Sequence, residues 1–132
     1  MKPLSLSVLP GRYAVHRFAA GTPMPQELLE ANFVQISRTP EELSVLCSDE
    51  FAPDSQHRFG PLAGLRVSGQ LDFALIGILA ELTRLLAAAE VSVFAVSSYD
   101  TDFLYVRVED FKGAIDALEV AGHRVEGAAE LG

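Results

Sequence analysis

The stretch LDFALIGILAELTRLLAAAEVSVFAVSSYDTDFLYV, residues 71–106, decides the fold of this chain. In its first half, apolar residues recur every three or four positions, which is the spacing of an amphipathic helix: Leu75, Leu79, Leu82, Leu86 and Ala89. The following run, EVSVFAVSS (90–98), is rich in β-formers and apolar on both faces, as a central strand would be. DFLYVRV (102–108) predicts a second strand. This stretch therefore predicts a helix followed by a strand hairpin.

The sequence on either side extends this order. GLRVSG (64–69) predicts a strand before the helix, and EDFKGAIDALEVAG (109–122) predicts a second helix that Gly122 caps at its C-terminal end. HRVEG (123–127) predicts a last strand. The order strand-helix-strand-strand-helix-strand (βαββαβ) predicts an α+β ferredoxin-like sandwich, in which two helices cover one face of an antiparallel sheet.

The first half predicts a less regular unit. Its alternating runs predict strands and one short run predicts a helix, in chain order LSLSVL (4–9), RYAVHRF (12–18), the helix PQELLEA (25–31), FVQIS (33–37) and LSVLC (43–47). The segment 48–64 has prolines, glycines and no apolar period, which is typical of a linker. We therefore expect a boundary near Gly60, with a degenerate copy of the sandwich in residues 1–60 and a complete one in residues 61–132.

Composition limits the function classes. The chain has 132 residues, of which 49% are hydrophobic and 21% charged, and a formal net charge of -8. This charge disfavours a nucleic-acid partner, because it would repel a phosphate backbone. A single cysteine, Cys47, in an apolar run predicts a buried thiol and fits a reducing cytoplasm. We expect no signal peptide, because the N-terminal residues lack a long apolar core, and no membrane span, because charged residues interrupt the most apolar region, 71–96.

Residues 65 to about 126 resemble an ACT domain. The resemblance rests on Gly77 at the corner between strand and helix, on the hairpin EVSVFAVSSYDTDFLYV and on the helix EDFKGAIDAL, all in the family's order. The chain is most similar to small tandem ACT proteins, which are related to the regulatory domains of aspartokinases and to CASTOR-type arginine sensors. This resemblance implies a regulatory module that binds a small molecule, commonly an amino acid, as a homodimer or an intrachain pair. It implies neither catalysis nor a cofactor.

The corner GQLDFALIG, residues 69–77, is the first part of the predicted ligand site. A glycine where a strand meets a helix leaves backbone N–H groups and the positive end of the helix dipole for a ligand carboxylate. Asp72 could hold an ammonium group. The structural alternatives are that Gly77 only permits close packing and that Asp72 only caps the helix.

The cluster SSYDTD, residues 97–102, is the second part of the predicted site. Asp100, Thr101 and Asp102 are typical of a hairpin turn, and the pair Ser97-Ser98 suggests a pocket wall as well. The predicted ligand-binding residues are Leu71, Asp72, Phe73, Leu75, Ile76, Gly77, Ile78, Val96, Ser97, Ser98, Tyr99, Asp100, Thr101 and Asp102.

Other chemistry is weakly supported. Two carboxylates in DTD lack the further oxygen ligands of a calcium loop, and no cluster of histidines or cysteines suggests a transition metal. His16, His57 and His123 are scattered along the chain, which predicts surface or structural roles and no catalytic triad. We therefore expect a cytoplasmic, non-catalytic regulatory protein with an amino-acid ligand and an unspecified protein target. The alternatives are a structural dimerisation module without a ligand and, least favoured, a small enzyme.

Overall fold

The computed structural model describes residues 2–51, 53–55, 57–68 and 76–127. These residues fall into two compact units, each described separately below. The discontinuous unit consists of Met1–Pro10 and Ala63–Gly132, and the inserted unit consists of Gly11–Leu62. This grouping differs from a division at residue 60, because residues 5–8 pair with residues 65–67 and with residues 124–126.

The discontinuous unit contains strands β1 (Ser5–Val8), β5 (His57–Val67, from Ala63 on), β6 (Phe94–Ser97), β7 (Asp102–Arg107) and β8 (Arg124–Glu126). Its strand order is β8-β1-β5-β7-β6. β1 runs antiparallel to β5, with Leu6 opposite Val67, and parallel to β8, with Leu6 opposite Val125. From β5 onward the elements follow the βαββαβ order, which confirms the ferredoxin-like α+β fold. The additional strand β1 lies between β8 and β5.

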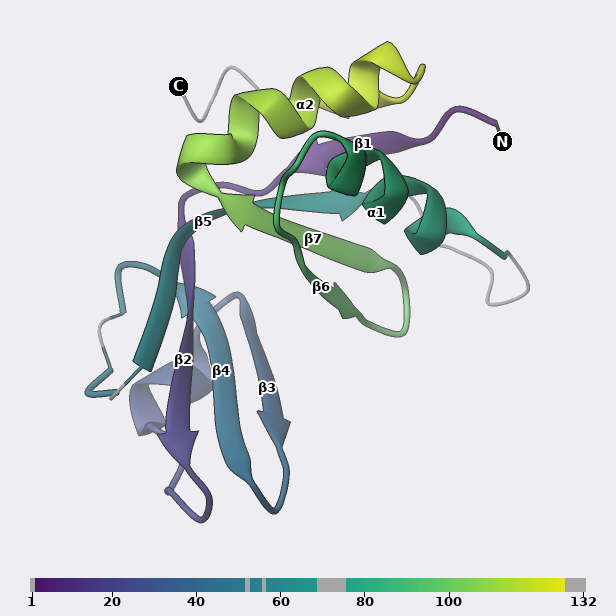
Figure 1. The fold of residues 1–132 in the computed structure, drawn as a ribbon. Coiled ribbons are helices and arrows are strands. Elements are labelled where there is room, and N and C mark those ends of the chain that lie inside the picture. The colour runs from purple at the N-terminus through teal and green to yellow at the C-terminus, as the bar shows by residue number, and fades with distance from the viewer. Residues whose placement is uncertain (1, 52, 56, 69–75, 128–132) are drawn as a thin grey trace. The chain divides into compact units, whose positions relative to one another are not determined.

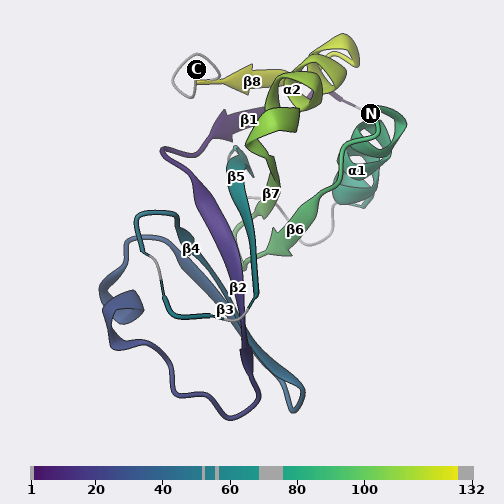
Figure 2. The same cartoon turned by 60° about the vertical axis from the view of Figure 1, so that its left-hand side comes forward.

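Helices α1 (Ile78–Ala88) and α2 (Phe111–Val120) lie on the same side of these strands (Figures 1 and 2). The predicted apolar stripe explains this placement, because Leu82 and Leu86 of α1 are fully buried against the sheet. Leu118 of α2 joins the same core, as do Leu65 and Leu104 from the strands. A short 3-10 turn, η2 (Val108–Asp110), leads from β7 into α2.

The C-terminal end of α2 follows the predicted cap. Gly122 has a φ of 97°, a left-handed conformation that glycine adopts without strain. The N–H of the next residue, His123, donates to the Leu118 carbonyl at 3.1 Å, as in a Schellman cap. The chain thereby turns from α2 directly into β8.

The inserted unit contains β2 (Tyr13–Ala19), the 3-10 helix η1 (Gln26–Glu30), β3 (Val34–Arg38), β4 (Glu42–Ser48) and the first part of β5. Its strand order is β3-β4-β2-β5, and all of these pairs are antiparallel. Its core gathers apolar side chains from the strands and from η1, namely Phe18, Leu28, Leu43, Val45 and Cys47. Burial of Cys47 confirms the prediction of a structural thiol.

Two predictions about strands were wrong. β5 begins at His57, so the second half of the predicted linker is a strand. At Gly60 the strands β5 and β2 approach closely, because a Cβ at Gly60 would lie 2.9 Å from the Cβ of Ala14, so this glycine does not mark a turn.

The second difference concerns β6. It was expected to be a central strand, but within the described residues it pairs with β7 alone. Its apolar side chains are therefore only partly covered.

Candidate functional site

The start of α1 is built around Gly77. This residue precedes the helix with a φ of 88°, and its carbonyl accepts the Glu81 N–H at 2.9 Å. Among the residues that the structure describes, no side chain caps the helix at this end. The first-turn N–H groups of a helix have no partner within the helix, so this end can receive an anion. On either side of Gly77, Ile76 is 90% exposed and Ile78 is buried in the core.

The remaining predicted residues of the corner, Leu71, Asp72, Phe73 and Leu75, lie outside the described residues. The described part of the corner therefore consists of Ile76, Gly77 and Ile78. Because Ile78 packs into the core, Ile76 and the backbone at Gly77 are the parts that remain at the surface.

The hairpin between β6 and β7 closes through its own polar side chains. The Ser98 N–H and its Oγ both donate to the Thr101 carbonyl, at 2.9 and 3.0 Å. In the neighbouring pair, where β6 ends and β7 begins, Ser97 Oγ donates to Asp102 Oδ1 at 2.5 Å. These bonds explain the two serines at the end of an otherwise apolar strand, because both stabilise the turn.

Thr101 has a different role from its neighbours. Its side chain is buried, and its Oγ1 donates to the Val67 carbonyl at 2.8 Å. Val67 is the last residue of β5, the strand that leads toward the predicted corner. Thr101 thus anchors the hairpin to the end of β5, and its hydroxyl is directed into the protein. A threonine within a polar turn gives no signal in the sequence that distinguishes this anchor from an exposed residue.

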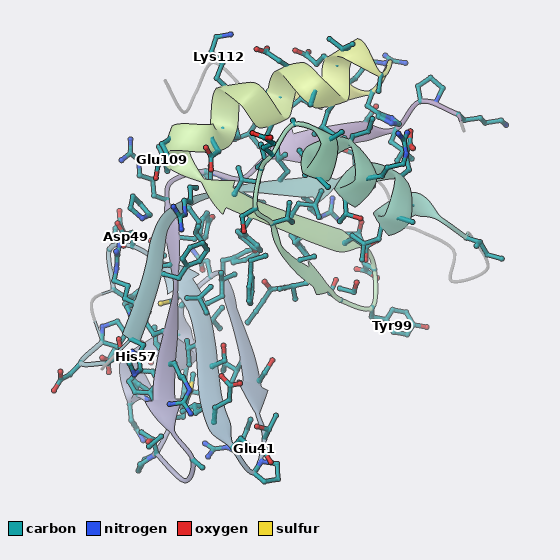
Figure 3. The ribbon with its side chains drawn as sticks, viewed as in Figure 1. Glu41, Asp49, His57, Tyr99, Glu109 and Lys112 are labelled. Carbon is teal, nitrogen blue, oxygen red and sulfur yellow. The ribbon has the colours of Figure 1, made fainter. Side chains whose placement is uncertain are left out.

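The other hairpin residues are closer to solvent. Tyr99 is 77% exposed and points away from the hairpin, as Figure 3 shows, and Asp100 is also exposed. Val96 is half-buried on β6. The described site residues therefore form two groups, one at the start of α1 (76–78) and one on the β6–β7 hairpin (96–102).

A third polar group next to α1 was not identified from the sequence. His123 Nε2 lies 3.3 Å from Glu81 Oε2, and His123 Nδ1 accepts the Leu4 N–H at 3.0 Å. The Arg84 guanidinium bonds to Glu81 Oε1 at 2.6 Å. Mainly through this Arg84 bond, and less through His123, the pKa of Glu81 is lowered from its ordinary value, although desolvation opposes the shift. Glu81 lies in the first turn of α1, so this group fixes the start of the helix.

Metal binding gains no support from these positions. Among the described residues, no three histidine, cysteine or acidic side chains gather in a way that could hold a metal ion. His16 and His123 are buried, whereas His57 lies at the exposed start of β5. In the described part of the chain, no helix is long and apolar enough to cross a membrane.

The βαββαβ order, the glycine before α1 and the β6–β7 hairpin are those of a ferredoxin-like domain. In agreement with this, residues 61–120 match the family model of the ACT domain. A second family model, which describes an N-terminal domain, matches residues 11–55. This second match lies within the inserted unit. A comparison with curated proteins found no match.

Solved structures extend the similarity over nearly the whole chain. A protein from Agobacterium tumefaciens is 29% identical with a TM-score of 0.86, over 95% of this chain and 93% of that chain. A Vibrio cholerae protein described as a "Possible Transport Protein" is 19% identical with a TM-score of 0.70, over 89% of this chain and 88% of that chain. The regulatory subunit of aspartate kinase from Thermus flavus is 10% identical with a TM-score of 0.65, over 91% of this chain and 99% of that chain. At identities this low, the last two similarities show the fold alone.

Proposed function

We propose that this protein is a non-catalytic regulatory protein that binds an amino acid at the start of α1. The observation that carries this proposal is the glycine-led N-terminus of α1, which no described side chain caps, in a segment that matches the ACT domain. ACT domains commonly bind amino acids. The similarity of its fold to a regulatory subunit of aspartate kinase supports a regulatory role without catalysis.

The chemistry of the two groups of residues suits a zwitterion. First-turn N–H groups and the helix dipole favour a carboxylate at Gly77. An ammonium group needs acceptors of opposite charge, and the candidates are the carboxylates of Asp72, Asp100 and Asp102. Asp102 also accepts a bond from Ser97. A molecule that carries both charges at a short separation, as an α-amino acid does, would satisfy both requirements.

We propose further that the chain assembles as a homodimer of tandem ACT-type units, as in CASTOR-type sensors, and that it acts on a protein target in the cytoplasm. The expectation of self-association is supported by β6, which among the described residues pairs with β7 alone and so leaves an edge for a second chain. Light scattering at tens of micromolar tests it. A monomer with and without ligand would contradict the homodimer.

A structural interaction module without a ligand is the alternative function. The observation that favours it is the exposure of two large side chains, Ile76 and Tyr99, on the same two segments that form the candidate site. Such side chains can anchor a protein interface as readily as they can flank a ligand. The two functions differ in whether a free amino acid binds.

A thermal-shift screen of the amino acids tests the proposal. A ligand at about one hundred times its dissociation constant adds about 2.7 kcal/mol to the native state. This stabilisation raises the melting temperature of a domain of this size by several degrees, on the order of 4 °C. If no amino acid raises the melting temperature at millimolar concentration, the interaction module is the better reading. If an amino acid is consumed, the protein is an enzyme.

Calorimetric titration of three variants then tests the site itself. Asp72→Asn and Asp100→Asn should each weaken binding, by about 1.5–3 kcal/mol where the carboxylate bonds directly to the ammonium group. Asp116→Asn on α2 is the matched control, because it removes an exposed carboxylate that pairs with Lys112. Equal affinity in the wild type and all three variants would show that these carboxylates are structural.

A further inference from the structure

His16 is a buried histidine in the core of the inserted unit. It lies on β2 with only 2% of its surface exposed, and its side chain shares a face with Ala14 and Phe18. Its partner on β4 is the core residue Val45, and its partner on β5 is Arg58. An imidazole at this position has an apolar environment on one side and a cationic neighbour on the other.

The two ring nitrogens of His16 differ in their partners. Nδ1 shares a hydrogen bond of 2.7 Å with Ser55 Oγ. Nε2 is buried and has no hydrogen-bond partner among the described residues. One neutral tautomer fits this environment, because Nδ1–H can donate to Ser55 while Nε2 carries only a lone pair. The imidazolium does not fit, because it would bury a charged N–H donor without an acceptor.

The charged groups near His16 also affect its protonation. Arg58 faces it from β5, and Asp49, after β4, is paired with Arg58. Among the described residues of this core, the other ionisable side chain is the thiol of Cys47 on β4. The acidic residues of the flanking segments are exposed, namely Glu27, Glu30, Glu50 and Asp54. Burial lowers the pKa of His16 first, and the Arg58 charge lowers it further, against a smaller opposite effect of Asp49.

The segment that follows β4 rests on this face of the unit. The Asp49 N–H donates to the Arg12 carbonyl at 2.7 Å, and the Phe51 N–H donates to the Ser48 carbonyl at 3.0 Å. The Phe51 side chain packs against the core, and Ser55 bonds to His16. The three attachments at Asp49, Phe51 and Ser55 hold this segment on the core.

We propose that His16 is an acid-sensitive switch in the inserted unit, and that its protonation loosens the attachment of Asp49, Phe51 and Ser55. The imidazolium must bring Nε2–H to water, and this requires the covering segment to move away from β2. Neutral His16 keeps the segment in place. The switch lies in a different unit from the proposed amino-acid site and does not depend on that site.

The direction of the pH effect follows from the lowered pKa. The unfolded chain binds a proton at His16 at a higher pH than the folded chain does, so the stabilisation is complete above the unfolded pKa of about 6.5 and is lost as the pH falls. One proton changes the opening equilibrium by up to about tenfold per pH unit. His123 is also buried but is unchanged in the variants used below, so a difference between them isolates His16.

Amide hydrogen exchange of the full-length chain tests the switch. The protection of the Asp49 and Phe51 amides is measured relative to that of Leu9 and Arg124, whose amides are bonded in the discontinuous unit. In the wild type, we expect this ratio to stay constant between about pH 8 and about pH 6.5 and to fall by up to about tenfold per pH unit between about pH 6.5 and about pH 5. In His16→Gln, it should stay constant over the whole range. His57→Gln, at the exposed start of β5, is the control and should behave as the wild type (Figure 3).

A second variant covers the case in which His16→Gln does not fold. Ser55→Ala keeps the imidazole but removes its hydrogen bond, so the Asp49 and Phe51 amides should already be less protected at about pH 8. A constant ratio in the wild type would overturn the proposal. So would an equal fall in the wild type and His16→Gln, or unchanged protection in Ser55→Ala.

Discussion

His123 and Glu81 are 42 residues apart in the sequence, yet Nε2 of His123 lies 3.3 Å from Oε2 of Glu81. Because His123 Nδ1 accepts the Leu4 N–H, the proton of the neutral ring is on Nε2 and is donated to Glu81. One imidazole thus joins the first turn of α1 to the backbone that enters β1. This contact connects the helix of the proposed ligand site to the strand that lies between β8 and β5.

We expect the Glu81 carboxyl to titrate below its ordinary range. Arg84 stabilises the carboxylate, so Arg84→Gln should raise the pKa of Glu81 toward the value of a free glutamate. The folded pKa is the lower one, so this contribution to stability is present above the unfolded value and is lost as the pH falls through the folded pKa. Carboxyl carbon shifts, followed by NMR from neutral to acidic pH, measure it. A Glu81 pKa that is the same with and without Arg84 would contradict this assignment.

His123 should contribute more to stability than a surface histidine. His123→Ala removes the acceptor of the Leu4 N–H and the donor to Glu81, and should lower the free energy of unfolding by about 1–3 kcal/mol. His123→Asn retains a side-chain acceptor close to the position of Nδ1, so it should recover part of the loss. Urea denaturation of both variants at neutral pH measures the difference. Equal stability of the two variants would show that the bond to Leu4 contributes little.

Thr101 should act as an anchor and not as a ligand contact. Thr101→Val has nearly the same shape but leaves the buried Val67 carbonyl without this donor, so we expect a loss of about 1–3 kcal/mol. Thr101→Ser keeps the hydroxyl and should lose less. Thermal melts of the ligand-free protein compare the two. Weaker amino-acid binding by Thr101→Val without a lower melting temperature would place the hydroxyl in the ligand site instead.

The predictable part of the fold is the part where local periodicity and packing agree. The stripe through Leu82 and Leu86 predicts α1, and the glycines at positions 77 and 122 predict its start and the end of α2. The partner of β1 was not predictable, because the alternation in LSLSVL gives the buried face of a strand but not its neighbour. Strand pairing depends on contacts between residues that are distant in the sequence, and the local pattern of a single sequence does not show which strands pair.

The candidate site shows the same limit. The hairpin turn was predicted from Asp100, Thr101 and Asp102, whereas the bonds by which Ser98 closes it were not predicted. The bonds from Thr101 to Val67 and from His123 to Glu81 and Leu4 span 34, 42 and 119 positions, so no spacing in the sequence indicated them. His16 was expected to be a surface histidine or a structural one with all its hydrogen bonds made, and it differs from both because its buried Nε2 has no partner among the described residues.

Gly64 should be required for close packing inside the discontinuous unit. A Cβ at this position would lie 2.7 Å from Leu9 Cδ1 and 2.8 Å from Cε1 of the fully buried Tyr105. Because that ring has little room to move, Gly64→Ala should cost about 1–3 kcal/mol. Gly113→Ala on α2 is the control, because a Cβ there has no neighbour within 4 Å and alanine is the better helix former by about 1 kcal/mol. Denaturation curves should shift in opposite directions for the two variants.

The discontinuous unit should fold only when β1 is present. β1 supplies Leu6 to the core and lies between β8 and β5, so residues 63–132 alone would lose a strand from the middle of their sheet. Where the two segments of this unit leave it, Val8 pairs with Leu65 and the Leu9 N–H donates to the Gly64 carbonyl. An Asn-Gly turn could therefore replace residues 11–62 and join β1 to residues 63–132 as a hairpin. We expect a cooperative melt and dispersed amide signals from this joined chain, and neither from residues 63–132 alone. A folded 63–132 fragment would show that β1 is an addition to a complete domain, and an unfolded joined chain would show that the unit requires the inserted residues.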